Sequence, residues 1–187
     1  MTVTAPDIDI TPYMLADGGA LDVPRCPDCW ERRAHIERYE YACRTLVPGG
    51  HQVLDFGCGV GYGSKMLMAA GNHVMGYDES AEARAHCEDM TVWSIWPPGR
   101  FDVYVAFEVI EHLEHPTAFI DAVNARHLIA SVPVVPTVGI NRHHKHDFTC
   151  DSFRALIERR FKIRWWWCQY RTFAPTPCVM IVHAEER

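Results

Sequence analysis

A carboxylate and a run of glycines stand together in the segment VLDFGCGVGYGS, residues 53–64. Asp55 ends an apolar run, and Gly57, Gly59 and Gly61 follow it. Glycine adopts positive φ freely and has no side chain, so this segment can turn sharply and let a ligand approach the backbone. The pattern predicts a cofactor-binding loop directly after a strand.

The spacing of these glycines restricts the ligand. A dinucleotide-binding loop follows the pattern G-x-G-x-x-G/A, but the third position, counted from Gly57 and Gly59, is Tyr62. A dinucleotide would also bring an anionic pyrophosphate close to Asp55, which would repel it. A ligand that carries positive charge fits the loop better.

A second group of reactive side chains follows the apolar run 102–107. Glu108, Glu111 and His112 stand at positions i, i+3 and i+4, so they share one face if this turn is helical. A capped helix with a solvated face explains the same spacing. The spacing alone leaves both readings open.

Three further histidines lie in the segment NRHHKHDF, residues 141–148. Such a run is typical of a solvated or phosphate-facing loop. We single out His146, because Thr149 or Asp151 shortly after it predicts the cap of a new helix. If the chain is an enzyme that deprotonates its substrate, His112 or His146 would be the base.

Composition bounds the class of protein. A chain of 187 residues with 48% hydrophobic residues predicts one domain with a substantial core. The net charge of -6 argues against broad nucleic-acid binding, although a local basic strip stays open as an alternative. The N-terminal segment lacks the pattern of a signal sequence, and no apolar stretch approaches the roughly 18 residues that span a membrane. We expect a soluble, cytoplasmic protein without a membrane partner.

Eight cysteines are dispersed along the chain, and we interpret most of them as small buried hydrophobes. Cys26 and Cys29 form a C-x-x-C turn that resembles half of a zinc site. His35 and Cys43 are the nearest further ligand candidates. Because no second half follows, free thiols in a turn or lid are the preferred interpretation.

Hydrophobic periodicity indicates the elements that position these residues. Residues 1–30 are expected to form a flexible leader or lid, and residues 31–187 a single domain. The run between residues 78 and 101 is short, so its helix and strand should be abbreviated. The predicted helices are 31–46, 62–70, 117–124 and 153–160, and the predicted strands are 52–56, 73–77, 102–107, 126–132, 161–170 and 177–184.

Three segments carry a family resemblance that extends over residues 31–184. VLDFGCGVGYGS resembles the first motif of class I S-adenosylmethionine (SAM) dependent methyltransferases, and HVMGYDES and FDVYVAFEVIEHLEHP resemble two later motifs. The resemblance implies an α/β, Rossmann-like class I methyltransferase sandwich, with a mostly parallel sheet and an antiparallel C-terminal strand pair. It implies SAM as the cofactor, with Asp78 accepting hydrogen bonds from the ribose. The implied cofactor-binding residues are Asp55, Gly57, Cys58, Gly59, Asp78, Glu79, Asp89, Met90 and Phe107.

The string EVIEHL is similar to a Glu-x-x-Glu-His element that binds a divalent metal in two groups of methyltransferases. These are the ubiquinone-pathway O-methyltransferases and the small-RNA 3′-terminal 2′-O-methyltransferases. The RNA enzymes add a histidine from a segment that resembles residues 145–148. The resemblance implies a Mg²⁺, Mn²⁺ or Zn²⁺ site, while related enzymes without a metal keep a glutamate and a histidine here, so both readings stay open. The implied metal ligands are Glu108, Glu111, His112 and His146.

The sequence thus predicts a SAM-dependent methyltransferase that acts on an oxygen or nitrogen of a small molecule, with or without a metal. Methylation of an RNA 3′ terminus is an alternative, supported by residues 142–145 and opposed by the acidic net charge. A SAM-binding scaffold without turnover is the third possibility.

Overall fold

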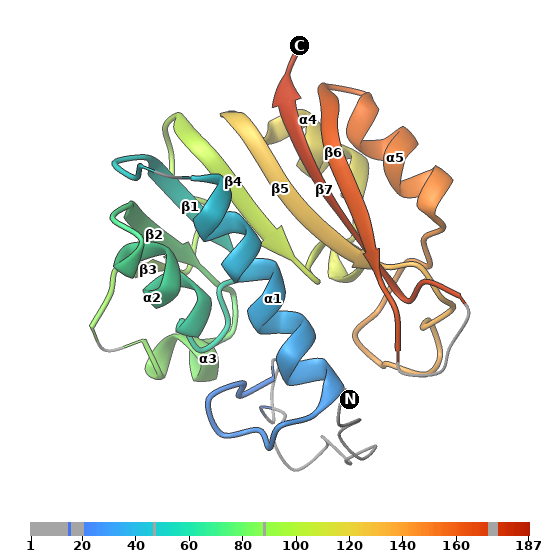
Figure 1. Cartoon of the computed structure of the whole chain (residues 1–187), viewed down its shortest axis with the longest axis horizontal. Coiled ribbons are helices and arrows are strands. Elements are labelled where there is room, and N and C mark those ends of the chain that lie inside the picture. Colours follow the sequence, from blue (N-terminus) through green and yellow to red (C-terminus); the bar gives the residue numbers. More distant parts are fainter. Residues whose placement is uncertain (1–14, 16–20, 47, 88, 172–175) are drawn as a thin grey trace.

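The structure, a computed structural model, describes residues 15, 21–46, 48–87, 89–171 and 176–187. One seven-stranded sheet runs through it in the order β3-β2-β1-β4-β5-β7-β6 (Figure 1). The strands are β1 Gln52–Phe56, β2 His73–Tyr77, β3 Val92–Trp93, β4 Phe101–Phe107, β5 Ala125–Pro133, β6 Phe161–Gln169 and β7 Val179–Glu186. The helices are α1 Trp30–Thr45, α2 Tyr62–Ala69, α3 Ala81–Ala85, the 3₁₀ helix η2 Ile110–His112, α4 Pro116–Ala122 and α5 Cys150–Glu158.

Strand direction confirms the predicted fold class. Strands β1 to β5 pair in parallel, and β7 runs antiparallel to both β5 and β6. The carboxyl ends of β1, β2 and β4 therefore meet at one edge of the sheet, where open α/β sheets bind ligands.

The sheet alternates its side chains between two cores. Val103 and Val105 of β4 pack with Tyr39 of α1 and Leu67 of α2. The intervening Tyr104 packs in the other core, together with residues of α4 and α5. This alternation is the period of two that a strand imposes, and it fixes helices on both faces of the sheet. The helix layers hold the loops at the carboxyl edge in place.

The segment after β2 is as short as the sequence predicts. Helix α3 spans Ala81–Ala85, and β3 contains only Val92 and Trp93. The predicted cap of α5 is also confirmed, because Thr149 accepts a hydrogen bond from Ser152 N–H in a reciprocal capping box.

Only part of the N-terminal segment lies among the described residues. Most of the proposed leader or lid, residues 1–14 and 16–20, lies outside them. Leu21, Val23, Cys26 and Cys29 are buried against one another and pack with Tyr62. Among the described residues, no helix is long and apolar enough to cross a membrane.

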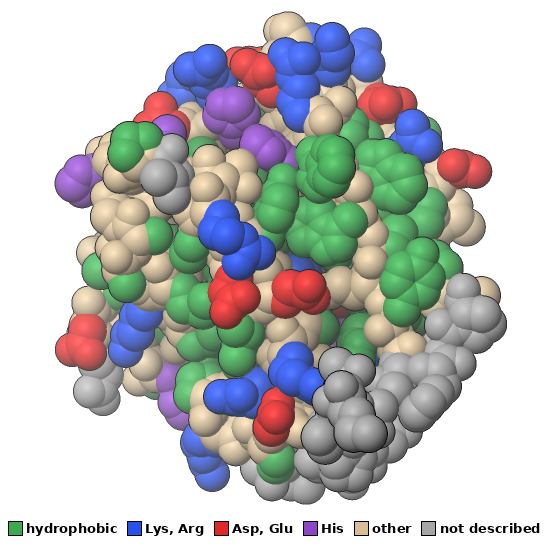
Figure 2. Space-filling model, viewed as in Figure 1, with side chains coloured by type: hydrophobic (Ala, Val, Ile, Leu, Met, Phe, Trp, Pro, Cys, Tyr) green, Lys and Arg blue, Asp and Glu red, His purple; other side chains and the backbone are tan. Residues whose placement is uncertain are grey.

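Hydrophobic side chains gather over β6 on the face shown in Figure 2. The run of three tryptophans forms part of this strand, as predicted. Trp165 and Trp166 are 60% and 46% exposed, whereas Trp167 packs on Tyr41 with ring centroids 4.1 Å apart.

Candidate functional site

The glycine loop follows β1 and turns through three residues of positive φ. The φ angles are 75° at Gly57, 54° at Gly59 and 77° at Gly61. Gly57 N–H donates to the carbonyl of Tyr77 at 2.7 Å, so the loop is tied to the end of β2. A Cβ added at Gly57 would lie 2.3 Å from Cγ2 of Val109, so glycine is required here by space as well as by φ.

Asp55 joins three elements beneath this loop. Its carboxylate is fully buried and accepts hydrogen bonds from the hydroxyls of Tyr39 at 2.9 Å and Ser64 at 2.5 Å. Burial raises the pKa of Asp55 to about 6, and these two hydrogen bonds oppose the rise. The sequence suggested a direct partner for a cationic ligand. In the structure both oxygens are engaged by protein hydroxyls, so Asp55 mainly anchors α1 and α2 to β1.

Tyr39→Phe should destabilise the fold, because one donor to the buried Asp55 carboxylate is lost while the aromatic ring stays. The expected loss is about 1–3 kcal/mol. The hydroxyl stabilises ionised Asp55, whose folded pKa is raised to about 6. The loss of unfolding free energy should therefore be smallest below about pH 6, where Asp55 is protonated in both folded proteins, and should grow as the pH rises through about 6. Urea unfolding at pH 5 and pH 8 measures this, and an equal loss at both values would contradict it.

Asp78 follows β2 and holds the tip of the glycine loop. One carboxylate oxygen accepts the N–H of Gly59 at 2.8 Å, and the other accepts the N–H of Ser80 at 2.9 Å. Burial raises the pKa of Asp78, and both backbone hydrogen bonds oppose this. The neighbouring Glu79 is exposed. Asp78 is thus the half-buried carboxylate at the carboxyl edge where a diol could be bound.

Asp78→Asn should weaken binding of S-adenosylhomocysteine (SAH) by about 1.5–3 kcal/mol, because a charged acceptor of ribose hydroxyl hydrogen bonds is lost. Titration calorimetry measures the effect, and circular dichroism checks that the variant is folded. Asp151→Asn, on the exposed first turn of α5, is the control and should bind normally. Unchanged affinity in folded Asp78→Asn would remove Asp78 from the cofactor site.

The remaining predicted cofactor residues lie around the same loop. Met90 packs against it, since its sulfur is 2.8 Å from the position of a Cβ added at Gly61. Asp89 is exposed and forms an ion pair with Lys65 of α2 at 3.6 Å. Phe107, at the end of β4, is buried and contacts the edge of the Tyr39 ring. Contact of these residues with a cofactor stays a prediction.

Arg38 is a residue of the site that the sequence analysis missed. Its side chain is 1% exposed, and its Nη1 donates to Oε1 of Gln169 at 2.6 Å. Its Nε has no hydrogen-bond partner within the described part of the chain. The signal was available, because Arg38 falls between Ala34 and Ala42 at intervals of four, on the buried face of α1. A charge on that face indicates a specific partner.

The turn after β4 differs from the predicted helix. Glu108 has φ 55°, and the 3₁₀ helix begins only at Ile110. Ser131 of β5 holds Glu108, because its hydroxyl donates to Glu108 Oε1 at 2.8 Å. The condition for a shared helical face is therefore not met, since Glu108 precedes the helix.

Glu111 is a buried carboxylate whose oxygens receive no hydrogen bond from the described residues. Its side chain is 1% exposed, and neither oxygen accepts a hydrogen bond within that part of the chain. Burial and the charge of Glu108 raise its pKa well above the usual range, while the charge of Arg38 partly opposes this. Such a group requires a proton, a cation or a ligand donor.

His112 lies beside Glu111, with Nε2 3.8 Å from Glu111 Oε1. Burial, followed by the nearby charges of His144, His143 and Lys145, lowers the pKa of His112 to about 4. The imidazole is therefore neutral near pH 7 and able to accept a proton.

The third member of this cluster is His144. The possible ligand atoms of Glu111, His112 and His144 lie within 4.8 Å of one another, the one such group of three or more among the described residues. His146 instead places Nε2 3.0 Å from the carbonyl of Leu113. Of the four predicted ligands, the structure thus brings Glu111 and His112 together with His144, whereas His146 and Glu108 lie outside this group.

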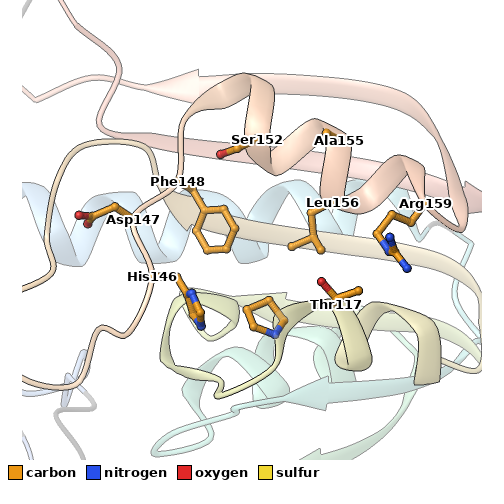
Figure 3. Close-up of a pocket in the computed structure, with 9 residues that line it drawn as sticks. Thr117, His146, Asp147, Phe148, Ser152, Ala155, Leu156 and Arg159 are labelled. Carbon is orange, nitrogen blue, oxygen red and sulfur yellow. The ribbon is translucent and has the colours of Figure 1, made fainter.

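Backbone hydrogen bonds explain why His144, and not His146, lies beside Glu111 and His112. Lys145 N–H and His146 N–H both donate to the carbonyl of Glu111, at 2.8 and 3.2 Å, which fixes the histidine loop against η2. His146 lines a neighbouring pocket of about 440 Å³ with Phe148 and Leu156 (Figure 3). This pocket lies between the start of α4 and α5, and residues of both helices line it.

Among the described residues, the C-x-x-C turn gains no further metal ligand. The Sγ atoms of Cys26 and Cys29 are 3.4 Å apart and buried. The Nδ1 atom of His35 lies 3.1 Å from the Tyr62 hydroxyl. His35 is not part of the group formed by Glu111, His112 and His144. The geometry favours the interpretation as free thiols.

A parallel sheet closed by an antiparallel strand pair, with a glycine loop after β1 and a carboxylate after β2, defines the class I methyltransferase architecture. The magnesium protoporphyrin IX methyltransferase of Synechocystis PCC 6803 with bound SAH has this fold, with a TM-score of 0.69 and 21% identity over 83% of this chain and 84% of that one. The small RNA methyltransferase HEN1 superposes with a TM-score of 0.67 and 18% identity over 81% of this chain and 25% of that one.

Residues 31–171 match the family model described as a methyltransferase domain, and the chain belongs to this family. The ubiquinone biosynthesis O-methyltransferase of Bradyrhizobium diazoefficiens is 32% identical over 149 residues, which are 72% of this chain and 56% of that protein. The chain thus spans about half the length of the curated relatives it matches.

Proposed function

We propose that this chain catalyses methyl transfer from SAM to an oxygen or nitrogen of a small molecule. The observation that carries this proposal is the pair formed by Glu111 and His112. A buried carboxylate without a hydrogen-bond partner among the described residues stands beside a neutral imidazole. Both follow β4 at the edge of the sheet that carries the glycine loop. This arrangement suits deprotonation of an acceptor next to the cofactor.

The cofactor would be held by the glycine loop and Asp78. When bound, SAM supplies an electrophilic methyl group on a sulfonium. Asp78 would accept hydrogen bonds from the ribose. Arg38 offers a buried cation to the carboxylate of the cofactor's amino-acid part, through an Nε–H that has no partner in the described part of the chain. The protein mainly aligns the two reactants, since methyl transfer is an in-line displacement.

His112 is the preferred base. With a pKa of about 4 it is uncharged near neutrality, and Glu111 at 3.8 Å, in its ionised form, would stabilise the imidazolium once a proton is taken. His146 is the weaker candidate, because its Nε2 is engaged by the Leu113 carbonyl.

A divalent metal would fit the same cluster. The two oxygens of Glu111, which have no hydrogen-bond partner among the described residues, offer hard ligand atoms, and His112 and His144 offer nitrogen within the same 4.8 Å group. A donor set with two imidazoles suits Mn²⁺ or Zn²⁺ better than Mg²⁺. Such an ion would lower the pKa of an acceptor hydroxyl.

Methylation of an RNA 3′ end is the second candidate. The observations that favour it are the likeness to the fold of HEN1 and the exposed Arg142 next to His143. The net charge of -6 disfavours it, because RNA binding normally needs a basic surface.

Label transfer from methyl-tritiated SAM distinguishes these possibilities. The acceptors are a panel of phenols, carboxylic acids and amines, set against a short RNA with a free 3′ end. Each assay is run with EDTA and with Mn²⁺ or Zn²⁺ added back. We expect label in a small molecule, and a loss of roughly 10²–10⁴-fold in His112→Asn but not in His115→Asn, on the exposed cap of α4. Label only in RNA supports the second candidate, and SAH binding without any transfer supports a scaffold.

We also propose that residues 31–187 form one SAM-binding domain that functions in the cytoplasm. The continuous sheet from β1 to β7 supports a single domain. All eight cysteines, each in the described part of the chain, are free thiols, which favours a reducing compartment.

A further inference from the structure

Helix α1 and the end of strand β6 are joined through one buried amide, the side chain of Gln169. This residue is 6% exposed and lies 131 residues beyond Arg38 in the chain. Nearby, Trp30 Nε1 donates to the carbonyl of Tyr170 at 2.9 Å, so the first turns of α1 lie beside the end of β6 (Figure 1). The backbone carbonyl of Gln169 accepts the N–H of Cys178 at 2.9 Å. Strand pairing therefore holds the amide in a fixed place against α1.

The three partners of the Gln169 amide determine its orientation. Its Nε2 donates to the carbonyl of Ala34 at 3.0 Å and to Oε2 of Glu37 at 2.7 Å. Its Oε1 accepts Nη1–H of Arg38 at 2.6 Å. A guanidinium can only donate, whereas a carbonyl and an ionised carboxylate can only accept, so a flipped amide would lose all three hydrogen bonds. Ala34 and Glu37 thus turn the amide oxygen toward Arg38.

Arg38 lies where α1 meets the candidate site. The next residue, Tyr39, binds Asp55 through its hydroxyl and contacts the edge of Tyr62, the first residue of α2, with ring centroids 5.3 Å apart. The charge of Arg38 lowers the pKa of Tyr62 and of Glu111, against the stronger effect of burial. The guanidinium therefore acts both on the start of α2 and on η2.

The guanidinium of Arg38 still has a donor to offer. Arg38 is 1% exposed, and its Nε has no hydrogen-bond partner among the described residues. A buried cation with an open donor suits a carboxylate, because charge-assisted hydrogen bonds are the strong ones in such a place. Gln169 takes one N–H of the same planar group and so restricts the direction in which the others point.

We propose that Gln169 is a positioning residue, which together with Glu37 holds the Arg38 guanidinium toward the carboxylate of the cofactor's amino-acid part. A free arginine side chain would lose rotamer freedom when the cofactor binds, whereas one that is held in advance does not. Gln169 acts through Arg38 and does not itself touch the cofactor. The inference rests on the proposed function, because it assumes that this site binds SAM.

Two ligands separate this role from a purely structural one. SAH carries the amino-acid carboxylate, whereas 5′-methylthioadenosine (MTA) has the same adenosine and thioether but lacks the amino-acid part. Titration calorimetry should show that the wild type binds SAH at least about tenfold more tightly than MTA. In Gln169→Leu, which removes the acceptor for Arg38, SAH affinity should fall by about tenfold while MTA affinity stays within about twofold of the wild type.

The chain offers a matched control for each change. Gln52→Leu makes the same substitution at an exposed residue, at the amino end of β1, and should bind both ligands normally. Glu37→Ala removes one acceptor of the Gln169 amide and should lower SAH affinity by less than Gln169→Leu does, without an effect on MTA. Glu40→Ala, at another exposed position of α1, is its control and should bind both ligands normally.

The outcomes distinguish failure of the inference from failure of the proposed function. Unchanged SAH affinity in folded Gln169→Leu overturns the positioning role, and so does an equal loss of affinity for SAH and MTA. Circular dichroism checks the fold, and if Gln169→Leu does not fold, the exposed Glu37→Ala decides in the same way. A wild type that binds SAH and MTA equally also overturns it, while SAM binding stands. A wild type that binds neither ligand contradicts the proposed function itself.

Discussion

Gly57→Val is expected to abolish SAH binding and to destabilise the fold by about 2–6 kcal/mol. A β-branched residue at φ 75° is strained by about 1–3 kcal/mol. Its Cβ would lie 2.3 Å from Val109 Cγ2, and overpacking of this kind costs typically about 1–3 kcal/mol more. Thermal unfolding and calorimetric titration with SAH measure both effects.

Gly139→Val separates strain from collision. Gly139 has φ 84°, and no atom of the described residues lies within 4 Å of its added Cβ, so this control suffers the strain alone. It should retain SAH binding with a smaller loss of stability. Normal SAH affinity in Gly57→Val would show that the loop after β1 is not the cofactor loop.

Glu111→Gln is expected to lower methyl transfer by roughly 10²–10⁴-fold while it stabilises the fold. The amide keeps the shape of the side chain but removes the buried charge. A glutamine at this position therefore neither stabilises a protonated base nor supplies a carboxylate to a metal. Glu114→Gln is the matched control, since Glu114 is exposed and paired with Lys145 at 2.7 Å. Its activity should stay close to that of the wild type.

The gain in stability should depend on pH. The pKa of Glu111 is raised well above its usual range in the folded state, first by burial. Its favourable contribution is therefore complete below the unfolded pKa of about 4.3 and is lost as the pH rises through the folded pKa. Glu111→Gln should match the wild type near pH 4 and exceed it at pH 8, as measured by urea unfolding. Full activity, or lower stability than wild type at pH 8, would contradict the role of Glu111.

Local patterns predict the parts of the site that lie directly at strand ends. Asp55, Gly57 and Asp78 follow short apolar runs, and the parallel pairing of β1 with β2 brings them to one edge. Their positions are therefore fixed by the strands themselves. The same logic predicts β4 and the position of Glu111 and His112 after it, because strand ends in such a sheet are set by hydrophobic periodicity.

Long-range contacts decide what the sequence does not predict. The exchange of His144 for His146 depends on two backbone N–H groups that donate to the Glu111 carbonyl, in a loop without any periodicity. The positive φ of Glu108 depends on Ser131 in a different strand. Arg38 carried a signal in its helical position, but its partner Gln169 lies at the end of β6.

Titration calorimetry of the wild-type chain with SAH and, separately, with NADH tests most directly whether the glycine loop and Asp78 bind SAM. We predict saturable binding of one SAH per chain, with Kd in the range of about 1 μM to 1 mM, and no binding of NADH. Saturable binding of NADH without any binding of SAH would contradict the assignment of this site.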